Sequence, residues 1–319
     1  MLPLRLKQHT IEQLRCPVCK GKINLEQDSF MCKKCAKEFP VVNGVPILIN
    51  EETSIFRIAD FITQGDIYFD TTPSKLYMFL SSHLPNLSLN VASNRNFERF
   101  QQKLLRKKEN SRVLILGCGI NPGIGSAALL NQPTIEVVET DVSWGPRTGL
   151  ICDAHDIPFA DGSFDGVVAQ AVLEHVISPY RCVEEIYRVL GTQGLVYAET
   201  PFMQQVHGGR YDFTRFTDLG HRCLFRGFRE IDRGLLCGPG MALAWSYEYF
   251  LSSFTKSKSL RKLIRLFARL TAFYLKYFDY LLIHSPGALD AASGLFFMGQ
   301  KLETLIEYRE LLNTYRGMD

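Results

Sequence analysis

The sequence lacks any uncharged apolar stretch of the roughly 18 residues that a membrane-spanning helix needs. Its first ten residues, from Met1 to Thr10, contain no apolar core long enough for a secretory signal. A large excess of charge of one sign is also missing, since the 319 residues carry a net charge of +3. These absences predict a cytoplasmic protein, and the charge by itself gives no indication of nucleic acid binding.

Outside one cluster of four near the N-terminus, the cysteines of the chain show no regular spacing. Disulfides are not expected, because the cytosol keeps thiols reduced. Five of the nine cysteines share no spacing and are expected to be buried free thiols: Cys118, Cys152, Cys182, Cys223 and Cys237. The length of the chain predicts two domains, or one large domain with an appendage, at about 150 residues per domain.

The other four cysteines form two Cys-x-x-Cys pairs, Cys16/Cys19 and Cys32/Cys35, with twelve residues between the pairs. Such pairs suit tetrahedral zinc, and four thiolates leave no open position for water. We therefore predict a structural zinc site in a ribbon of residues 1–50, which the metal helps to fold. A redox pair is the alternative, although it would need only one of the two motifs.

Residues 14–49 resemble the small zinc ribbon of activator subunits of RNA- and protein-modifying methyltransferases, which is also fused to some bacterial methyltransferases. The resemblance rests on the four cysteines and on the ending Phe39-Pro40…Gly44-Val45-Pro46. Residues 51–110 are interpreted as a linker with cap helices. Helical patterning occurs at 62–68, 75–84 and, most clearly, 96–107.

A nucleotide-type pocket is predicted after residue 110. The apolar run 113–116 leads into the turn Gly117-Cys118-Gly119-Ile120-Asn121-Pro122-Gly123, then a helix at 124–130 and a strand from Ile135 that ends at Asp141. Glycines let the backbone approach a ligand, and an acid after the second strand accepts hydrogen bonds from ribose hydroxyls. Glu139 is a competing ribose acid.

The segment from Asp153 to Asp165, the strand 166–171 and Leu173-Glu174-His175-Val176 together resemble class I S-adenosylmethionine-dependent methyltransferases of the small-molecule type. The resemblance covers about residues 110–235. It implies an α/β fold with a Rossmann-like seven-stranded sheet in residues 111–319 and S-adenosylmethionine as the cofactor. A degenerate fold that binds no cofactor is the alternative, but the acids and glycines stand at the expected positions.

The resemblance also implies roles for single residues. Carried over, Gly117 and Gly119 line the methionine end, Asp141 holds the ribose, Asp153 and Ala154 meet the adenine, and Gln170 lies near the amino acid portion of the cofactor. The turn departs from the usual Gly-x-Gly-x-Gly at Asn121-Pro122, so the contributions of Asn121, a further candidate, and of Gly123 are open.

A polar and aromatic loop at residues 204–216 follows the predicted strand 195–200 and is expected to face the acceptor. Candidate general bases are His207 and His175, with Asp212 as an orienting or basic carboxylate. The alternatives are that His175 only buttresses the turn and that His207 is an ordinary loop residue. Arg210 and Arg215 either grip an anionic acceptor or are surface charges.

Two strands, 228–234 and 293–301, are expected to form an antiparallel pair at the sheet edge, with a helical insert at about 238–290 between them. Residues 258–283 predict one basic amphipathic helix, and no acid occurs between Lys256 and Lys276. Its cationic side comprises Lys258, Lys262, Arg265, Arg269 and Lys276. Packing of the apolar side on the domain is favoured, and peripheral contact with an anionic membrane or a lipid-like substrate is the alternative.

These patterns predict methyl transfer from S-adenosylmethionine to a small-molecule, lipid or glycan-linked acceptor at oxygen. One alternative is an RNA base methyltransferase that uses the lysines of the ribbon to contact phosphates or a partner, although no Asn-Pro-Pro-Tyr-type motif is present. A non-catalytic binding or scaffold protein is another. The sequence gives no indication of the oligomeric state.

Overall fold

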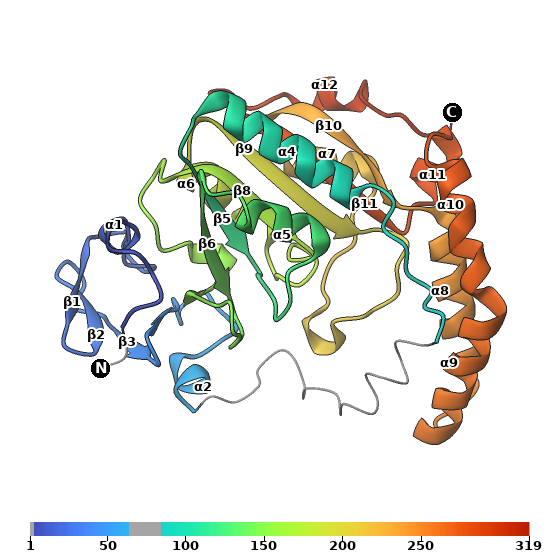
Figure 1. Cartoon of the computed structure of the whole chain (residues 1–319), viewed down its shortest axis with the longest axis horizontal. Coiled ribbons are helices and arrows are strands. Elements are labelled where there is room, and N and C mark those ends of the chain that lie inside the picture. Colours follow the sequence, from blue (N-terminus) through green and yellow to red (C-terminus); the bar gives the residue numbers. More distant parts are fainter. Residues whose placement is uncertain (1–2, 64–83, 319) are drawn as a thin grey trace.

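The computed structural model describes residues 3–63 and 84–318 (Figure 1). The helical patterning noted at 62–68 and 75–84 therefore lies outside the described residues, except at 62–63 and 84.

One sheet runs through the molecule, in the order β1-β2-β3-β4-β7-β6-β5-β8-β9-β11-β10. Its strands are β1 (Ile23–Glu26), β2 (Ser29–Cys32), β3 (Glu38–Val42), β4 (Val45–Leu48), β5 (Ser111–Leu116), β6 (Ile135–Asp141), β7 (Leu150–Cys152), β8 (Phe164–Gln170), β9 (Leu190–Pro201), β10 (Phe228–Cys237) and β11 (Gly294–Lys301). Strands β7, β6, β5, β8 and β9 are parallel, and β11 lies antiparallel between β9 and β10.

The whole sheet has eleven strands rather than the seven predicted for the methyltransferase domain. The seven strands from β7 to β10 form the Rossmann-like part, and the ribbon adds four more. Strand β4 pairs in parallel with β7, with Ile47 opposite Ile151 and Leu48 opposite Cys152. The ribbon thus extends the sheet that carries the glycine turn.

Apolar side chains are buried on both faces of the central strands, as expected for parallel strands covered by helices. Leu114, Val167 and Val196 belong to one buried cluster, whereas Val113 and Val168 belong to the cluster on the other face. The first cluster also contains side chains of the ribbon, namely Leu14, Cys16, Ile23, Phe30, Cys32, Phe39 and Leu48. The ribbon and the central sheet therefore share one core.

Helices cover both faces of the sheet, and further helices lie at its far end (Figure 1). They are α1 (Gln8–Glu12), α2 (Ile58–Ile62), α4 (Ser93–Lys107), α5 (Ile124–Leu130), η1 (Ala154–Asp156), α6 (Pro179–Val189), η2 (Gly209–Tyr211), α7 (Asp218–Leu224), α8 (Pro239–Ser252), α9 (Lys258–Ala272), η3 (Phe273–Phe278), α10 (Asp279–Leu282), α11 (Pro286–Asp290) and α12 (Tyr308–Leu312). Among the described residues, no helix is both long enough and apolar enough to cross a bilayer.

The single helix predicted for residues 258–283 was wrong, because α9, η3 and α10 replace it. Two buried polar anchors hold the interrupted segment. The Nζ of Lys276, predicted on the solvated side, is buried and donates to the backbone oxygen of Asn86 at 2.8 Å. The carboxylate of Asp279 accepts from the backbone N–H groups of Gly238, Gly240 and Met241 at the start of α8.

The favoured packing of that segment was also wrong. Helix α9 packs on α8, and Ala268 and Ala272 are its buried residues. Two of its cations, Arg265 and Arg269, lie 3.4 Å and 3.7 Å from the Glu248 carboxylate on α8. The outward side of the segment instead carries exposed apolar side chains, namely Leu260, Leu263, Phe267, Leu270, Tyr274, Tyr277, Phe278 and Leu281.

Candidate cofactor and acceptor site

At two positions of the glycine turn after β5, the backbone has a conformation that only glycine adopts without strain. Gly117 and Gly119 have φ values of +67° and +63°. A Cβ on Gly117 would lie 2.6 Å from Cγ2 of Val172, whereas a Cβ on Gly119 would meet no atom of the described structure within 4 Å. The turn therefore packs closely on one side and leaves open space beside Gly119.

Asp141, at the end of β6, faces this turn. Its Oδ2 accepts a hydrogen bond from the backbone N–H of Gly119 at 2.8 Å. Burial raises the pKa of Asp141, against the lowering effect of the backbone donors Gly119, Val142 and Ser143. The competing acid Glu139 is paired with Arg147, whose guanidinium also donates to the Cys118 carbonyl.

An apolar cavity begins at the turn and runs beneath η1. Its lining includes Gly117, Gly119, Asp141, Asp153, Ala154 and His175, all named from the sequence. Asp153 is held on both oxygens, because Oδ1 accepts from the His155 ring at 2.6 Å and Oδ2 accepts from Ser54 at 2.5 Å. Burial by itself would raise the pKa of Asp153, but the contact with His155 outweighs this effect and lowers the pKa.

The lining also includes two residues from the stretch that the sequence predicts as a linker. Ile55 and Phe56 belong to the segment after the ribbon and line the same space as Asp141 and Ala154. Phe56 also packs against Tyr211 of the acceptor loop, with 5.8 Å between ring centroids. The sequence predicts a linker at this segment, and its adjacent apolar pair is the one local signal of a role in the cavity.

A second, more polar cavity lies on the other side of the turn and shares Gly117, Gly119 and Ala171 with the first. Asn121, Gln170 and His207 line it, as do Glu174 and Glu199, which the sequence analysis did not select. The amide of Gln170 donates to Glu199 Oε2 at 2.8 Å. The other oxygen of Glu199 accepts from Ser93 and Tyr197, both at 2.5 Å, and burial raises the pKa of this acid.

The two candidate bases His175 and His207 lie next to each other, with 5.1 Å between their ring centroids. Both Nε2 atoms lie 3.8 Å from Oε1 of Glu174. Burial raises the pKa of Glu174 to about 8 and lowers that of His175.

Asp212 has a different environment from the two histidines. It pairs with Arg215 and accepts from the backbone N–H groups of His207 and Gly208 at 2.8 Å and 3.2 Å. Although burial opposes them, these contacts lower the pKa of Asp212. The structure thus favours Asp212 as an orienting group of the loop rather than as a base.

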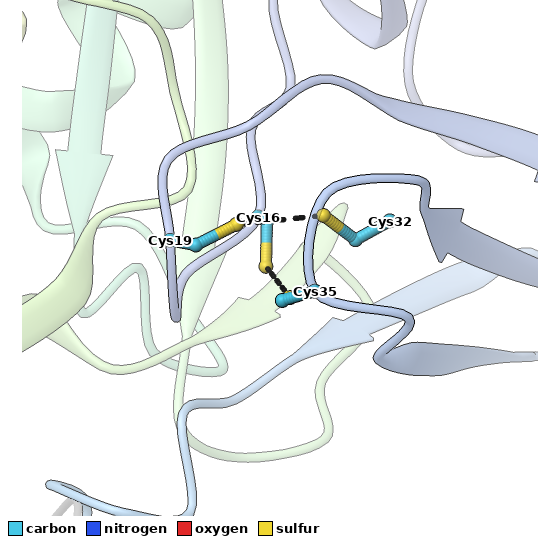
Figure 2. Close-up of side chains that lie close together, drawn as sticks. All are labelled: Cys16, Cys19, Cys32 and Cys35. Atoms are coloured by element: carbon cyan, nitrogen blue, oxygen red, sulfur yellow. Dashed lines mark hydrogen bonds between the residues drawn. The ribbon is translucent and has the colours of Figure 1, made fainter.

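The four cysteines of the ribbon converge on one point (Figure 2). The sulfur–sulfur distances are 3.6 Å for Cys16 and Cys35 and 3.5 Å for Cys19 and Cys32. Zinc–sulfur bonds of about 2.3 Å in a tetrahedron place sulfurs roughly 3.8 Å apart. Burial by itself would raise the pKa of the Cys32 thiol. Hydrogen bonds from the backbone N–H groups of Cys35 and Lys34 outweigh this effect and lower the pKa to about 7. This sulfur set fits a structural zinc ion.

A family model described as a methyltransferase domain matches residues 114–198, from β5 to β9. Residues 114–198 are therefore similar to a methyltransferase domain, in agreement with the motifs that resemble class I S-adenosylmethionine-dependent methyltransferases. Over 144 residues the chain is 28% identical to the ubiquinone/menaquinone biosynthesis C-methyltransferase UbiE of Geotalea uraniireducens, covering 40% of this chain and 58% of that protein. The chain spans about half the length of the first curated relatives it matches, 46% and 58%.

The ribbon has relatives of its own. A stretch of 44 residues, or 13% of this chain, is 41% identical to 75% of a UPF0434 protein of Photobacterium profundum. The N-terminal segment therefore belongs to that family.

Among solved structures, a sarcosine dimethylglycine methyltransferase from Galdieria sulphuraria aligns with 71% of this chain and 97% of that chain, at 13% identity and a TM-score of 0.42.

Proposed function

We propose that the protein transfers a methyl group from S-adenosylmethionine to an oxygen of a small-molecule, lipid or glycan-linked acceptor. The observation that carries this proposal is the pair of cavities that meet at the glycine turn. One is apolar and contains Asp141, and the other is polar and contains Gln170, Glu199 and His207.

The apolar cavity suits the adenosine half of the cofactor. Asp141 is placed to accept hydrogen bonds from ribose hydroxyls, and Ile55 and Phe56 offer apolar surface to the adenine. Ala154 lines the same cavity as Ile55 and Phe56. In the polar cavity, Gln170 and Glu199 face the space next to the turn and suit the amino acid portion.

When bound, S-adenosylmethionine supplies a methyl carbon that is activated by the sulfonium. The protein must then hold an acceptor oxygen in line with that carbon and help it lose its proton. His207 lines the polar cavity, and its ring lies next to His175. This position supports His207 as the group that activates an acceptor hydroxyl.

The proposal of a lipid-linked acceptor rests on the outward side of α9. Its apolar residues are joined by Phe250 of α8 and by Phe254 in the turn that follows this helix, both exposed. Lys256, Lys258 and Lys262 are exposed beside them, with no acid from Lys256 to Lys276. A helix with exposed apolar and cationic side chains suits the surface of a membrane that contains anionic lipid.

Isotope transfer tests the reaction. The protein is incubated with methyl-labelled S-adenosylmethionine and with separate polar, lipid and RNA extracts of the source cells, and the labelled product is analysed by mass spectrometry. We expect label in the polar or lipid extract, and a large loss of label with His207→Ala. Label in RNA alone would contradict the acceptor class, and a failure to bind S-adenosylmethionine in calorimetry would contradict the reaction itself.

Flotation with liposomes tests the membrane contact. We expect the wild type to float with vesicles that contain phosphatidylglycerol and the double variant L263E/F267E to remain in the dense fraction. The two side chains are 63% and 54% exposed, so the fold should tolerate the change. L312E, at an equally exposed position of α12, is the matched control and should float like the wild type. Equal flotation of all three proteins would rule out α9 as the contact.

A further inference from the structure

The carboxylate of Glu174 is unusual in its surroundings. Its side chain is 1% exposed, and among the described residues neither of its oxygens has a hydrogen-bond partner. A buried acid without a donor is costly, because the hydration that it loses is not replaced. Such a group calls for a cation or a proton beside it.

Two imidazoles present acceptor atoms to this carboxylate. The Nδ1 of His175 lies 2.8 Å from the Tyr211 carbonyl, which requires a proton on Nδ1 and leaves the lone pair on Nε2. The Nδ1 of His207 lies 3.3 Å from the Gln205 carbonyl and 3.5 Å from Asp212 Oδ2. Two acceptor oxygens and one donor, Arg215 Nη2 at 3.5 Å, thus surround Nδ1 of His207. This environment favours a proton on Nδ1 and leaves the lone pair on Nε2, as in His175.

We propose that Glu174, His175 and His207 bind a divalent transition-metal ion, such as Zn²⁺, at the wall of the polar cavity. Their ligand atoms all lie within 4.8 Å of one another. Two imidazole nitrogens and one carboxylate oxygen form a donor set that zinc and other first-row ions accept, and three protein ligands leave a position for another molecule.

The geometry needs only a small adjustment to close around an ion. Ligands at about 2.0–2.2 Å from a tetrahedral ion lie roughly 3.3–3.5 Å apart, whereas each Nε2 lies 3.8 Å from Glu174 Oε1. His207 belongs to a loop and its side chain is 27% exposed, so it can make that shift. The carbonyls that hold Nδ1 orient both rings, as partners of metal-bound histidines commonly do.

The role of this ion rests on the proposed function. Glu174 and His207 line the same cavity as Gln170 and the glycine turn, so the open position faces the acceptor side. An acceptor hydroxyl bound there loses its proton to solvent water more readily. Its oxygen then forms the bond to the methyl carbon while the carbon–sulfur bond breaks, and that electron pair stays on sulfur. His207 thus activates the oxygen through the metal.

Metal content tests the site without any need for turnover. The full chain is dialysed against Zn²⁺, washed and analysed by elemental mass spectrometry, with Co²⁺ spectra as a second readout. We expect two ions per chain in the wild type and one in both E174Q and H207A. The remaining ribbon ion should keep the thiolate-to-cobalt charge-transfer band, and this band also reports that the variants are folded. H284A replaces an exposed histidine on another segment and should retain both ions.

One ion per wild-type chain, or two in E174Q and H207A, would overturn the metal site. If E174Q does not fold, H207A decides, because its side chain lies on a loop. The result is separable from the reaction. A wild type that transfers methyl groups with only the ribbon ion would refute the metal site and leave the proposed function, with His207 acting as a base.

Discussion

The backbone N–H of Gly119 donates to the carboxylate of Asp141, with 2.8 Å between nitrogen and Oδ2. The glycine follows β5, and the acid ends the neighbouring parallel strand β6. The hydrogen bond therefore fixes the position of the turn relative to the acid, and a ligand that contacts one of them meets the other at a set distance.

We predict that Asp141→Asn weakens binding of S-adenosylmethionine and S-adenosylhomocysteine by roughly 10- to 100-fold, because hydrogen bonds to a charged group contribute about 1.5–3 kcal/mol. Isothermal titration calorimetry measures this change. Glu139→Gln is the matched control and should bind like the wild type, since Glu139 is paired with Arg147. Weak binding by E139Q together with normal binding by D141N would identify Glu139 as the ribose acid instead.

Much of the central sheet could be predicted from the sequence because its cues are local. The helix expected at 124–130 is α5, and the apolar run 113–116 lies in β5, ahead of the glycine turn. The pairing of β4 with β7 could not be predicted, because about a hundred residues separate Ile47 from Ile151 and neither strand specifies its partner. The orientation of α9 was also missed, since periodicity shows that a helix has an apolar side but not which side packs.

The candidate site divides in the same way. Gly119 and Asp141 belong to a local strand–turn–helix–strand pattern, from which the sequence predicts both as cofactor ligands. Glu174 was part of the quoted motif but was not selected, because its burial and its closeness to His207 arise only from the tertiary fold. Ile55 and Phe56 line the cavity although they lie far before the glycine turn in the sequence, and their adjacent apolar side chains are the one local feature that marks them.

The position of Ile55 leads to a second prediction. Its side chain lines the apolar cavity and is half-exposed, so a bound adenine would cover it. Ile55→Ala should weaken binding of S-adenosylmethionine by about 1 kcal/mol, or roughly fivefold, through lost apolar contact. Ile62→Ala alters a similarly exposed isoleucine of α2 that does not line this cavity, and it should leave the affinity measured by calorimetry unchanged. Equal affinities for both variants would place the adenine elsewhere.

The ribbon should be coupled to the methyltransferase domain in stability. Cys16 and Cys32 share a buried cluster with Val167 and Val196 of the sheet. Lys20 of the ribbon also lies 2.8 Å from the Glu185 carboxylate on α6. We expect Cys32→Ser, or removal of zinc with a chelator, to lower the melting temperature of the whole chain by roughly 10 °C in a single calorimetric transition, as several kcal/mol of binding energy is lost.

Cys223→Ser is the control for this experiment, because Cys223 is a half-buried thiol far from the four-cysteine cluster in the sequence. It should melt close to the wild type. Two separate transitions, with the S-adenosylmethionine-stabilised transition unchanged in C32S, would show that the ribbon is an independent unit.

The imidazole of His221 predicts a specific sensitivity to acid. It is buried in α7 beside Phe216, Phe225 and Phe297, and burial, with the nearby Arg233, lowers its pKa from 6.5 to about 3. Between these values the unfolded chain binds a proton that the folded chain does not, so stability falls as the pH decreases from about 6.5 toward 3. From pH 7 to pH 5 this group should remove about 2 kcal/mol of unfolding free energy.

His221→Phe keeps a ring of similar size and removes the titrating group. Its loss of stability between pH 7 and pH 5, measured by urea unfolding, should therefore be smaller than that of the wild type by about 2 kcal/mol. His284→Phe changes an exposed histidine and should show the full pH dependence of the wild type. Because the wild type and H221F differ in this titrating group alone, the difference between their pH dependences isolates His221. Identical slopes for wild type and H221F would mean that this imidazole becomes protonated without unfolding the protein.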